Sequence, residues 1–584
     1  LAVQLEKQIG KKKILERYVN SVFFGNGAYG VQAASEVYFD KNVTQLNWAE
    51  GALLAALIRS PTNYNPFRFP KIAQHQRDLV FQRLIETHRL TAAQVKVYKL
   101  VPLPTVQHSP TPVQDYFIEA VKQQLLDDPS FGLGATPEAR KAAVFGGGLR
   151  IFTTFDPVAQ HSATDARDDT VPGGRHDGTF DVADPRTGQP VIDPKTGQPT
   201  FGTQAIVSIE PSTGAVRVMV GGPGFDKYKF NLATAQRQPG SSMKMYVLAS
   251  LFENGYVPND LVNGGHCTFN FPGDSMPYSP PTEGGYGTIT AATKVSSNCA
   301  FMRLGQLIGL PTVASMATQL GITTPLQVTT STGGTFYPNN LPLGTVGVEP
   351  FDQAAAYSVI ANDGVRNAPY MVDKIEDRTG RVIYKHTLNP QRVITSQAAR
   401  EVAQVLQANV QGGTGTAAQQ PDGQPAAGKT GTTNDSTNVW FVGFTPQLAT
   451  AIWMGVVGGN IPLNWATNLG GQSLYGATGG KFPAKTWGVF YQKYLAGKPI
   501  EDFLAPGPER PGKPVGKIPY EVGAGGTGSG TTHHRSTGTG NRGGAGGGTT
   551  GTTPADPDGG DTTPTTSGGI PLGGAPTGAG GTGQ

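Results

Sequence analysis

Hydrophobic residues recur every three or four positions through residues 1–108, as at Ile14, Tyr18 and Val22. A second series of this kind contains Leu46, Ala49, Leu53, Leu54, Leu57 and Ile58. This spacing matches one face of an amphipathic helix. We therefore predict a mainly helical segment over residues 1–108, interrupted where prolines cluster between Pro61 and Pro70.

Residues 201–504 instead alternate strand-like and helix-like runs, which predicts a domain of mixed α+β structure. The strand-like runs are Ala205–Glu210, Val216–Val220, Val439–Phe444 and Thr450–Val456, and the helix-like runs are Ser242–Asn254 and Ala399–Leu406. The last two strand-like runs are separated by a short turn. They predict an antiparallel hairpin near the end of this domain.

The pattern weakens between these segments, over residues 109–200. A helix is predicted near Gln114–Leu126 and a strand over Leu149–Phe155. The sequence Asp184–Pro190 is then nearly repeated at Asp193–Pro199, with an Asp-Pro-x-Thr-Gly turn in each copy. We interpret residues 109–200 as a linker region in which the repeat forms a surface hairpin or linker.

The end of the chain lacks the residues that build a core. No aromatic residue follows Tyr520, and the large aliphatic residues after it are Val522, Ile570 and Leu572. The chain has 80 Gly and 46 Pro among 584 residues, and this end holds much of that excess. Since little apolar surface is available to offset the entropy of ordering, we predict a disordered tail over residues 505–584.

Charge and cysteine content exclude several classes of function. The net charge is +4 and charged residues make up 15% of the chain, so no strong field favours a nucleic-acid partner. No apolar run is long enough to span a bilayer. Cys267 and Cys299 are too few for a disulfide framework or a four-cysteine zinc site, although they leave a single bridge open. We expect no metal and no cofactor.

Candidate chemistry begins at Ser241 and Lys244, which follow Pro239 at the predicted start of a helix. Positions three apart share a helix face, so Lys244 would lie close enough to take the proton of the Ser241 hydroxyl. A Ser-x-x-Lys tetrad is weak evidence by itself. An N-cap serine and a solvated lysine would give the same pattern.

Two further motifs strengthen this interpretation. Ser296–Asn298 supplies a Ser-x-Asn motif, and Lys429–Thr432 supplies Lys-Thr-Gly-Thr just before the predicted hairpin. Ser-x-x-Lys, Ser-x-Asn and Lys-Thr-Gly, in this order, are the motifs of serine acyl-enzymes. The second motif relays a proton and holds a substrate amide, and the third places a cation and a strand edge along the substrate.

Three other matches fit less well. Lys195–Gly197 is a Lys-Thr-Gly that precedes the candidate nucleophile and lies in the turn repeat, and Ser436–Asn438 is a Ser-x-Asn that follows the lysine motif. Gly423–Thr430 matches the phosphate-binding P-loop pattern. That loop requires a strand before it and a helix after it, and the polar segments on both sides predict neither.

With these motifs in place, residues 1–500 resemble a class A, bifunctional penicillin-binding protein. The resemblance includes Gln238–Ser241 at the nucleophile, Gly412–Ala417 and Ala427–Thr432, and Trp440–Pro446 after them. It implies a transpeptidase of the penicillin-binding and serine β-lactamase-like fold, an antiparallel sheet flanked by helices, at residues 201–504. Before it would lie the C-terminal part of a mainly α, lysozyme-like glycosyltransferase domain at residues 1–108.

The resemblance also implies roles for the motif residues. Ser241 is the expected nucleophile, Lys244 its base, Ser296 a proton relay and Asn298 a ligand of the substrate amide. Lys429 is the second cation and lowers the pKa of Lys244, as burial does. Thr430, Gly431 and Thr432 line the substrate. The implied partners are D-Ala-D-Ala stem peptides of peptidoglycan and β-lactam antibiotics, on the outer face of the bacterial cytoplasmic membrane.

The glycosyltransferase part of the resemblance rests on Lys13–Asn20, Gly27–Val31 and Pro61–Pro66. It makes Glu16 the family's second active-site glutamate, although the sequence alone favours a solvated helix carboxylate that pairs with Lys12 or Lys13. The chain begins at Leu1 inside a helical pattern. We expect the general-base glutamate and the membrane anchor of the family to lie upstream, and therefore no polymerisation of lipid II by this chain alone.

Two alternatives to transpeptidation stay open. A D,D-carboxypeptidase or a β-lactamase uses the same three motifs with water as the acceptor. A cell-envelope scaffold would keep the fold without the chemistry and recruit partners through its tail, which the presence of Ser241, Lys244 and Lys429 disfavours.

Overall fold

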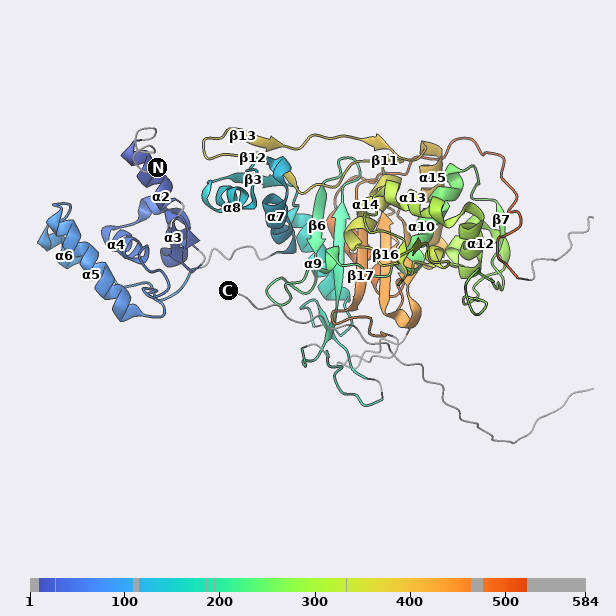
Figure 1. Ribbon diagram of the computed structural model, residues 1–584, viewed down its shortest axis with the longest axis horizontal. Helices are drawn as coiled ribbons and strands as arrows, with labels where there is room; N and C mark the ends of the chain where they lie inside the picture. Colours follow the sequence, from blue (N-terminus) through green and yellow to red (C-terminus); the bar gives the residue numbers. More distant parts are fainter. Residues whose placement is uncertain are drawn as a thin grey trace, which may run out of the picture. The chain divides into compact units, whose positions relative to one another are not determined.

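The computed structural model describes residues 10–522, except for 21, 27, 109–114, 174, 185, 194–195, 332 and 464–475. Its first part, up to residue 108, is mainly helical, as the hydrophobic period predicts (Figure 1). The helices are α2 (Lys11–Val19), α3 (Val31–Phe39), α4 (Trp48–Leu57), α5 (Pro70–Glu86) and α6 (Ala92–Tyr98), and a short hairpin joins β1 (Phe23–Gly25) and β2 (Ala28–Tyr29).

Local sequence explains where helix α4 begins. Asn47 caps it by accepting hydrogen bonds from the backbone N–H groups of Ala49 and Glu50, and the Glu50 carboxylate accepts one from the Asn47 N–H in return. Leu53 and Leu57 are then buried in a small core with residues of α3. The helical period in this part of the sequence therefore marks a packed face.

The second part of the chain is built around one antiparallel sheet. Within the described residues it has six strands in the order β15-β16-β17-β5-β4, with β6 also paired to β5. The strands are β4 (Thr179–Asp181), β5 (Phe201–Ile209), β6 (Val216–Val220), β15 (Ala427–Thr432), β16 (Asn438–Phe444) and β17 (Ala449–Val456). Strands β16 and β17 confirm the predicted hairpin, and Trp440 pairs with Trp453 in their register.

Helices cover both faces of this sheet, so its strands are buried almost throughout (Figure 1). Alternate residues serve the two faces: Val207 joins the larger core, while Ile206 joins the core on the other side. The helices of the larger core include α10 (Lys244–Glu253), α11 (Ile289–Lys294), α12 (Asn298–Ile308), α13 (Leu310–Leu320), α14 (Pro350–Ala361) and α15 (Ser396–Gly412). Helices α9 (Pro157–Thr170) and α16 (Pro483–Leu495) pack on the opposite face.

Smaller elements surround this sandwich. Helices α7 (Tyr116–Asp127) and α8 (Pro137–Gly146) precede a three-stranded sheet of β3 (Arg150–Thr153), β12 (Val372–Glu376) and β13 (Val382–Lys385). Two-stranded ladders pair β7 (Leu261–Asn263) with β8 (Tyr286–Thr288), β9 (Val328–Thr329) with β10 (Thr335–Phe336), and β11 (Val365–Arg366) with β14 (Gln391–Arg392).

Residues 109–200 differ from the predicted linker. Their helix and strand lie close to the predicted positions, but β3 pairs with β12, and α9 packs on the sheet beside α16. No local sequence pattern indicates that β3 pairs with a strand more than 200 residues away. The turn repeat does form hairpin-like turns, with bridges from Ala183 to Pro190 and from Ile192 to Pro199.

The predicted tail differs as well, over residues 505–522. Ile518 is buried against Phe269 and Phe271, and Glu521 forms a β-bridge with Phe269 and an ion pair with Arg303. Both apolar and polar contacts therefore tie this segment to the domain. Residues 523–584 lie outside the described part of the chain.

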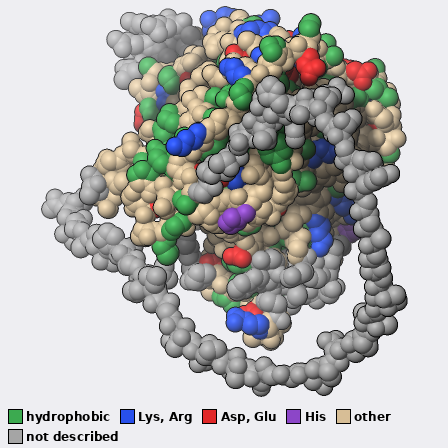
Figure 2. Space-filling view, turned by 90° about the vertical axis from the view of Figure 1, so that its right-hand side faces the viewer, with side chains coloured by type: hydrophobic (Ala, Val, Ile, Leu, Met, Phe, Trp, Pro, Cys, Tyr) green, Lys and Arg blue, Asp and Glu red, His purple; other side chains and the backbone are tan. Residues whose placement is uncertain are grey.

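Two further properties of the described residues concern membrane-spanning helices and charged patches on the surface. No helix among the described residues combines the length and the apolar character needed to cross a bilayer. On the face that Figure 2 shows, basic and acidic side chains are scattered among polar atoms without a patch of one sign. This distribution agrees with the small net charge of +4.

Candidate active site

Ser241 lies in a 3₁₀ turn, Gly240–Met243, that leads directly into helix α10. The sequence predicts a helix start here, and the structure places the first α-helical residue at Lys244. The turn is packed closely on both sides. Gly240 has φ of 55°, and a Cβ atom on it would lie 2.7 Å from the carbonyl oxygen of Thr432. Glycine at this position therefore lets the candidate nucleophile approach strand β15.

Lys244 is fully buried at the start of α10 and points toward the Ser-x-Asn motif. Its Nζ donates hydrogen bonds to the carbonyl oxygen of Ser296 at 2.6 Å and to Oδ1 of Asn298 at 2.8 Å, and it lies 3.3 Å from Oγ of Ser296. The first two motifs thus meet in space, although Ser296 is 52 residues from Lys244 along the chain.

Lys429 on strand β15 is also fully buried and approaches the same hydroxyl group. Its Nζ donates to Oγ of Ser296 at 2.8 Å and to the carbonyl oxygen of Thr430 at 3.1 Å. Ser296 therefore has its hydroxyl between two amines. Its backbone has φ of 57°, a strained conformation for a residue other than glycine, which is common at functional sites.

The environment disfavours protons on both amines. Burial lowers the pKa of Lys244 well below its ordinary value, the charge of Lys429 lowers it further, and Glu283 acts in the opposite direction. Burial lowers the pKa of Lys429 to about 7. Burial thus favours the neutral form of each amine, and one proton shared by the pair would make one amine a base and the other a cation.

Residues Thr430–Thr432 lie at the edge of the sheet, because β15 is its terminal strand. The hydroxyl groups of Thr430 and Thr414 lie 2.7 Å apart, and Oγ1 of Thr432 accepts a hydrogen bond from the N–H of Gly479. A Cβ atom on Gly431 would lie 2.2 Å from the carbonyl oxygen of Pro239, so β15 touches the turn before Ser241. An edge strand leaves backbone groups available to an extended ligand.

Sequence reasoning missed residues that support this site. Trp440 donates from Nε1 to the carbonyl oxygen of Gln238, the residue directly before Pro239, and the carbonyl oxygen of Gly344 accepts from the N–H of Gly240. Glu283 approaches Asn298 from the loop between β7 and β8. Gln238 and Trp440 lie within the motifs that the sequence analysis identified, although their hydrogen bond was not predicted. Glu283 and Gly344 lie in loops in which no sequence motif indicated them.

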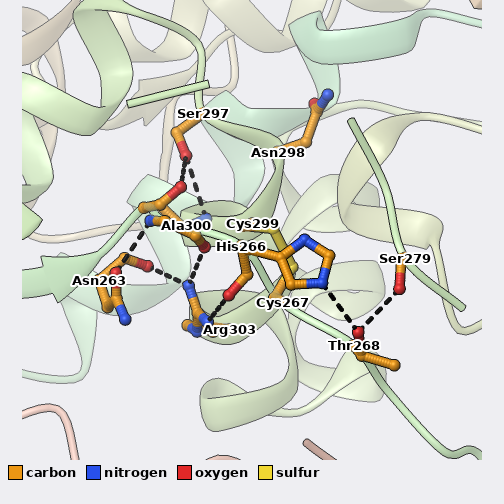
Figure 3. The surroundings of a disulfide bond; sticks show 12 residues. Asn263, His266, Cys267, Thr268, Ser279, Ser297, Asn298, Cys299, Ala300 and Arg303 are labelled. Carbon is orange, nitrogen blue, oxygen red and sulfur yellow. Dashed lines mark hydrogen bonds between the residues drawn. A yellow bond between two sulfur atoms is a disulfide. The ribbon is translucent and has the colours of Figure 1, made fainter. Parts of the chain in front are cut away.

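A disulfide joins Cys267 to Cys299, which the sequence left open. Cys299 directly follows Asn298 in the first turn of α12, and Ser297 caps this helix by accepting from the N–H of Ala300 (Figure 3). Arg303, one turn further along, donates to the carbonyl oxygens of Asn263 and His266. The start of α12 is thus tied to the chain around Cys267 by covalent and polar bonds.

The remaining candidates lie elsewhere. Glu16 is an exposed residue of α2, and its role stays a prediction. Asn438 is buried and accepts a hydrogen bond from Nε1 of Trp453, which is a structural role. The P-loop match runs into strand β15, which is followed by a three-residue 3₁₀ turn, Asn434–Ser436, and then by strand β16, instead of the α-helix that a P-loop requires. Lys195 of the early Lys-Thr-Gly lies outside the described residues.

Comparison with family models assigns the two parts of the chain separately. Residues 204–464 match the model described as the penicillin-binding protein transpeptidase domain, and residues 1–85 match the model described as transglycosylase. The three motifs of the candidate site all lie within the first of these matches.

Curated relatives cover both parts. Penicillin-binding protein 1A of Aquifex aeolicus is 29% identical over 520 residues, which is 78% of this chain and 68% of that protein. The protein of the same name from Mycobacterium tuberculosis is 32% identical over 538 residues, 87% of this chain and 59% of that protein. The chain therefore spans between 59 and 68% of the length of these two relatives.

Solved structures agree at the level of the fold. Penicillin-binding protein 1A from Haemophilus influenzae superposes with a TM-score of 0.64 at 21% identity, covering 85% of this chain and 87% of that one. PonA1 from Mycobacterium tuberculosis, in complex with penicillin V, superposes with a TM-score of 0.55 at 25% identity, covering 68% of this chain and 99% of that one.

Proposed function

Because the chain belongs to the class A, bifunctional penicillin-binding proteins, we propose that its second part is a peptidoglycan D,D-transpeptidase that acts through Ser241. The observation that supports this most directly is the Ser296 hydroxyl lying within 3.3 Å of two buried lysine amines. This arrangement gathers a base, a proton relay and a cation around the Ser296 hydroxyl, and Ser241 lies in the turn that leads directly to Lys244.

In the first step, Oγ of Ser241 attacks the carbonyl carbon of the penultimate D-Ala of a stem peptide. Lys244 takes the hydroxyl proton, because its lowered pKa favours the neutral amine. The C–N bond to the terminal D-Ala then breaks, and Ser296 relays the proton that Lys244 took from Ser241 to the leaving amine. The products are an ester on Ser241 and free D-Ala.

In the second step, an amine from a neighbouring stem attacks the ester carbonyl. The new amide bond forms, the C–O bond to Ser241 breaks, and the proton of the attacking amine returns to Oγ through the same groups. The backbone N–H groups of Ser241 and Thr432 would stabilise the oxyanion in both steps. Removing one such donor typically costs a factor of about 100 to 1,000 in rate.

Substrate binding uses the edge of the site. Asn298 would hold a substrate amide, and Thr430 and Thr432 would hold the substrate carboxylate, aided by the charge of Lys429. Gly431 would let the substrate lie along β15. β-Lactams would acylate Ser241 because they resemble the D-Ala-D-Ala end of the stem.

The first part of the chain supports a second activity for the whole protein. Residues 1–85 match the transglycosylase model, and we propose that Glu16 belongs to a site for lipid II. Because the proposed substrates of both activities lie outside the cell, we also propose that the protein acts at the outer face of the cytoplasmic membrane, within the cell envelope.

The experiment that tests the transpeptidase site is intact-protein mass spectrometry after exposure to benzylpenicillin. We expect one covalent adduct on the wild type, none on Ser241→Ala, and an undiminished adduct on Ser242→Ala, the neighbouring serine. A wild type without an adduct would contradict the proposal. Incubation with a D-Ala-D-Ala peptide and a D-amino acid then separates transfer from hydrolysis, because only a transpeptidase exchanges the terminal residue.

A further inference from the structure

Glu283 makes two hydrogen bonds to one residue of the candidate site. Its Oε2 accepts from the backbone N–H of Asn298 at 3.2 Å, and its Oε1 accepts from Nδ2 of the same residue at 3.2 Å. Asn298 is the first residue of α12, so the carboxylate also lies at the positive end of a helix. The two bonds hold both the backbone and the side chain of Asn298.

The Asn298 amide lies between groups of opposite hydrogen-bonding character. Its Nδ2 faces the Glu283 carboxylate, which only accepts, and its Oδ1 faces Nζ of Lys244, which donates at 2.8 Å. Turning the amide over would place oxygen against carboxylate and N–H against amine. The two neighbours therefore select one orientation, and one N–H of Nδ2 is left over for another acceptor.

The loop that carries Glu283 is fixed in place. The N–H of Gly264 donates to the carbonyl oxygen of Gly285, next to the ladder of β7 and β8, and a Cβ atom on Gly284 would lie 3.1 Å from Cγ2 of Val295. The Cys267–Cys299 disulfide joins the start of α12 to the segment that follows β7 (Figure 3). Glu283 is thus held against the residues that flank Ser296.

We infer that Glu283 is a positioning residue of the transpeptidase centre: it fixes the Asn298 amide so that its oxygen faces Lys244 and one N–H is presented to a substrate carbonyl group. This inference rests on the proposed function. Glu283 then acts on the substrate only through Asn298. Its carboxylate has a second effect, because its negative charge favours the protonated form of Lys244.

The charges around Lys244 come from few elements. Lys429 faces it from β15, Glu283 faces it from the loop between β7 and β8, and the Asn298 amide and the Phe301 ring on α12 carry no charge. Lys294 of α11 directs its amine toward Gly412 instead. Since the negative charge of Glu283 raises the pKa of Lys244, its removal should let Lys244 lose its proton at lower pH.

The test is Glu283→Gln, which keeps the size of the side chain and removes its charge. We expect the second-order rate constant for acylation by benzylpenicillin to fall about tenfold, and the acidic limb of its pH profile to move to lower pH. Asp274→Asn is the matched control, because Asp274 is an exposed acid of the same loop that contacts Asn339. It should change neither quantity.

A double-mutant cycle separates positioning from general damage. If Glu283 acts through Asn298, Glu283→Gln should slow acylation far less in an Asn298→Ala background than in the wild type. Equal effects in both backgrounds, or a wild-type rate and pH profile for Glu283→Gln with an unchanged unfolding midpoint, would overturn the inference. A wild type that forms no adduct at all would instead refute the proposed function, so the two failures are distinguishable.

Discussion

Lys244 and Lys429 have similar surroundings but different expected roles. Both are fully buried and both donate toward the Ser296 hydroxyl, yet Lys244 also has Asn298 and Glu283 beside it, while Lys429 binds the backbone of its own strand. The pKa of Lys244 lies well below its usual range, and that of Lys429 is lowered to about 7. We therefore expect Lys244 to act as the base and Lys429 as the cation of the site.

This difference predicts an alkaline limb in the acylation profile. As pH rises through about 7, Lys429 loses its proton, so the cation that attracts the substrate carboxylate disappears and the second-order rate constant should fall. Lys429→Arg keeps its charge to much higher pH. The variant should acylate more slowly because Arg is larger, but its alkaline limb should move upward. An unmoved limb would show that another group controls it.

Two adjacent serines at the start of helix α12 have different roles, one in the chemistry of the site and one in the structure of the helix. Ser296 presents its hydroxyl to the two lysines, while Ser297, fully buried, caps the helix and donates to the carbonyl oxygen of Gly264. Adjacent residues of the same type thus have separate tasks, because the left-handed backbone at Ser296 turns the chain between them.

We predict that one alanine substitution mainly slows acylation and the other mainly lowers stability. Ser296→Ala should slow acylation by a factor of about 100 or more, through loss of the proton relay, with little change in the unfolding free energy. Ser297→Ala should lower the unfolding free energy by about 1 kcal/mol, through loss of the cap, with a smaller effect on acylation. Denaturant unfolding and benzylpenicillin acylation of both variants check this. Similar changes in both measurements for both variants would contradict it.

At the scale of the whole molecule, the chain returns to α12 near the end of its described part. Glu521 pairs with Arg303, 218 residues earlier, and both side chains are less than a tenth exposed. The Arg303 guanidinium also binds the loop carbonyls that precede and follow Gly265. The segment after residue 505 is therefore part of the structure that supports the Ser-x-Asn motif.

Removing one partner of this ion pair should be costly, since the other charge would stay buried. We expect Glu521→Gln to lower the free energy of unfolding by about 3 kcal/mol. Glu509→Gln provides the control, because Glu509 lies in the same segment but is exposed and bonds only to Asn259 among the described residues. It should change stability by less than about 1 kcal/mol. Equal midpoints for the two variants in thermal unfolding would exclude a supporting role for the pair.

Short-range patterns in the sequence were enough to predict several elements and the motif residues. The β16–β17 hairpin, the helices of residues 11–98 and the three motifs around Ser241, Ser296 and Lys429 follow from periodicity, turn residues and a three-residue helix spacing. These features are local, because a strand alternates and a helix repeats within a few residues. The low pKa of Lys244 was expected from burial and a second cation, and its direction agrees.

Contacts between residues that are distant in the sequence became apparent only in the folded structure. The pairing of β3 with β12, the Cys267–Cys299 bond, the approach of Glu283 to Asn298 and the return of Glu521 to Arg303 join residues that share no periodic pattern. Such contacts depend on how packed layers bring loops together, and a loop carboxylate in the sequence has no feature that distinguishes it from a solvated one. For that reason the sequence identified the motif residues of the site, while the groups that orient them emerged from the fold.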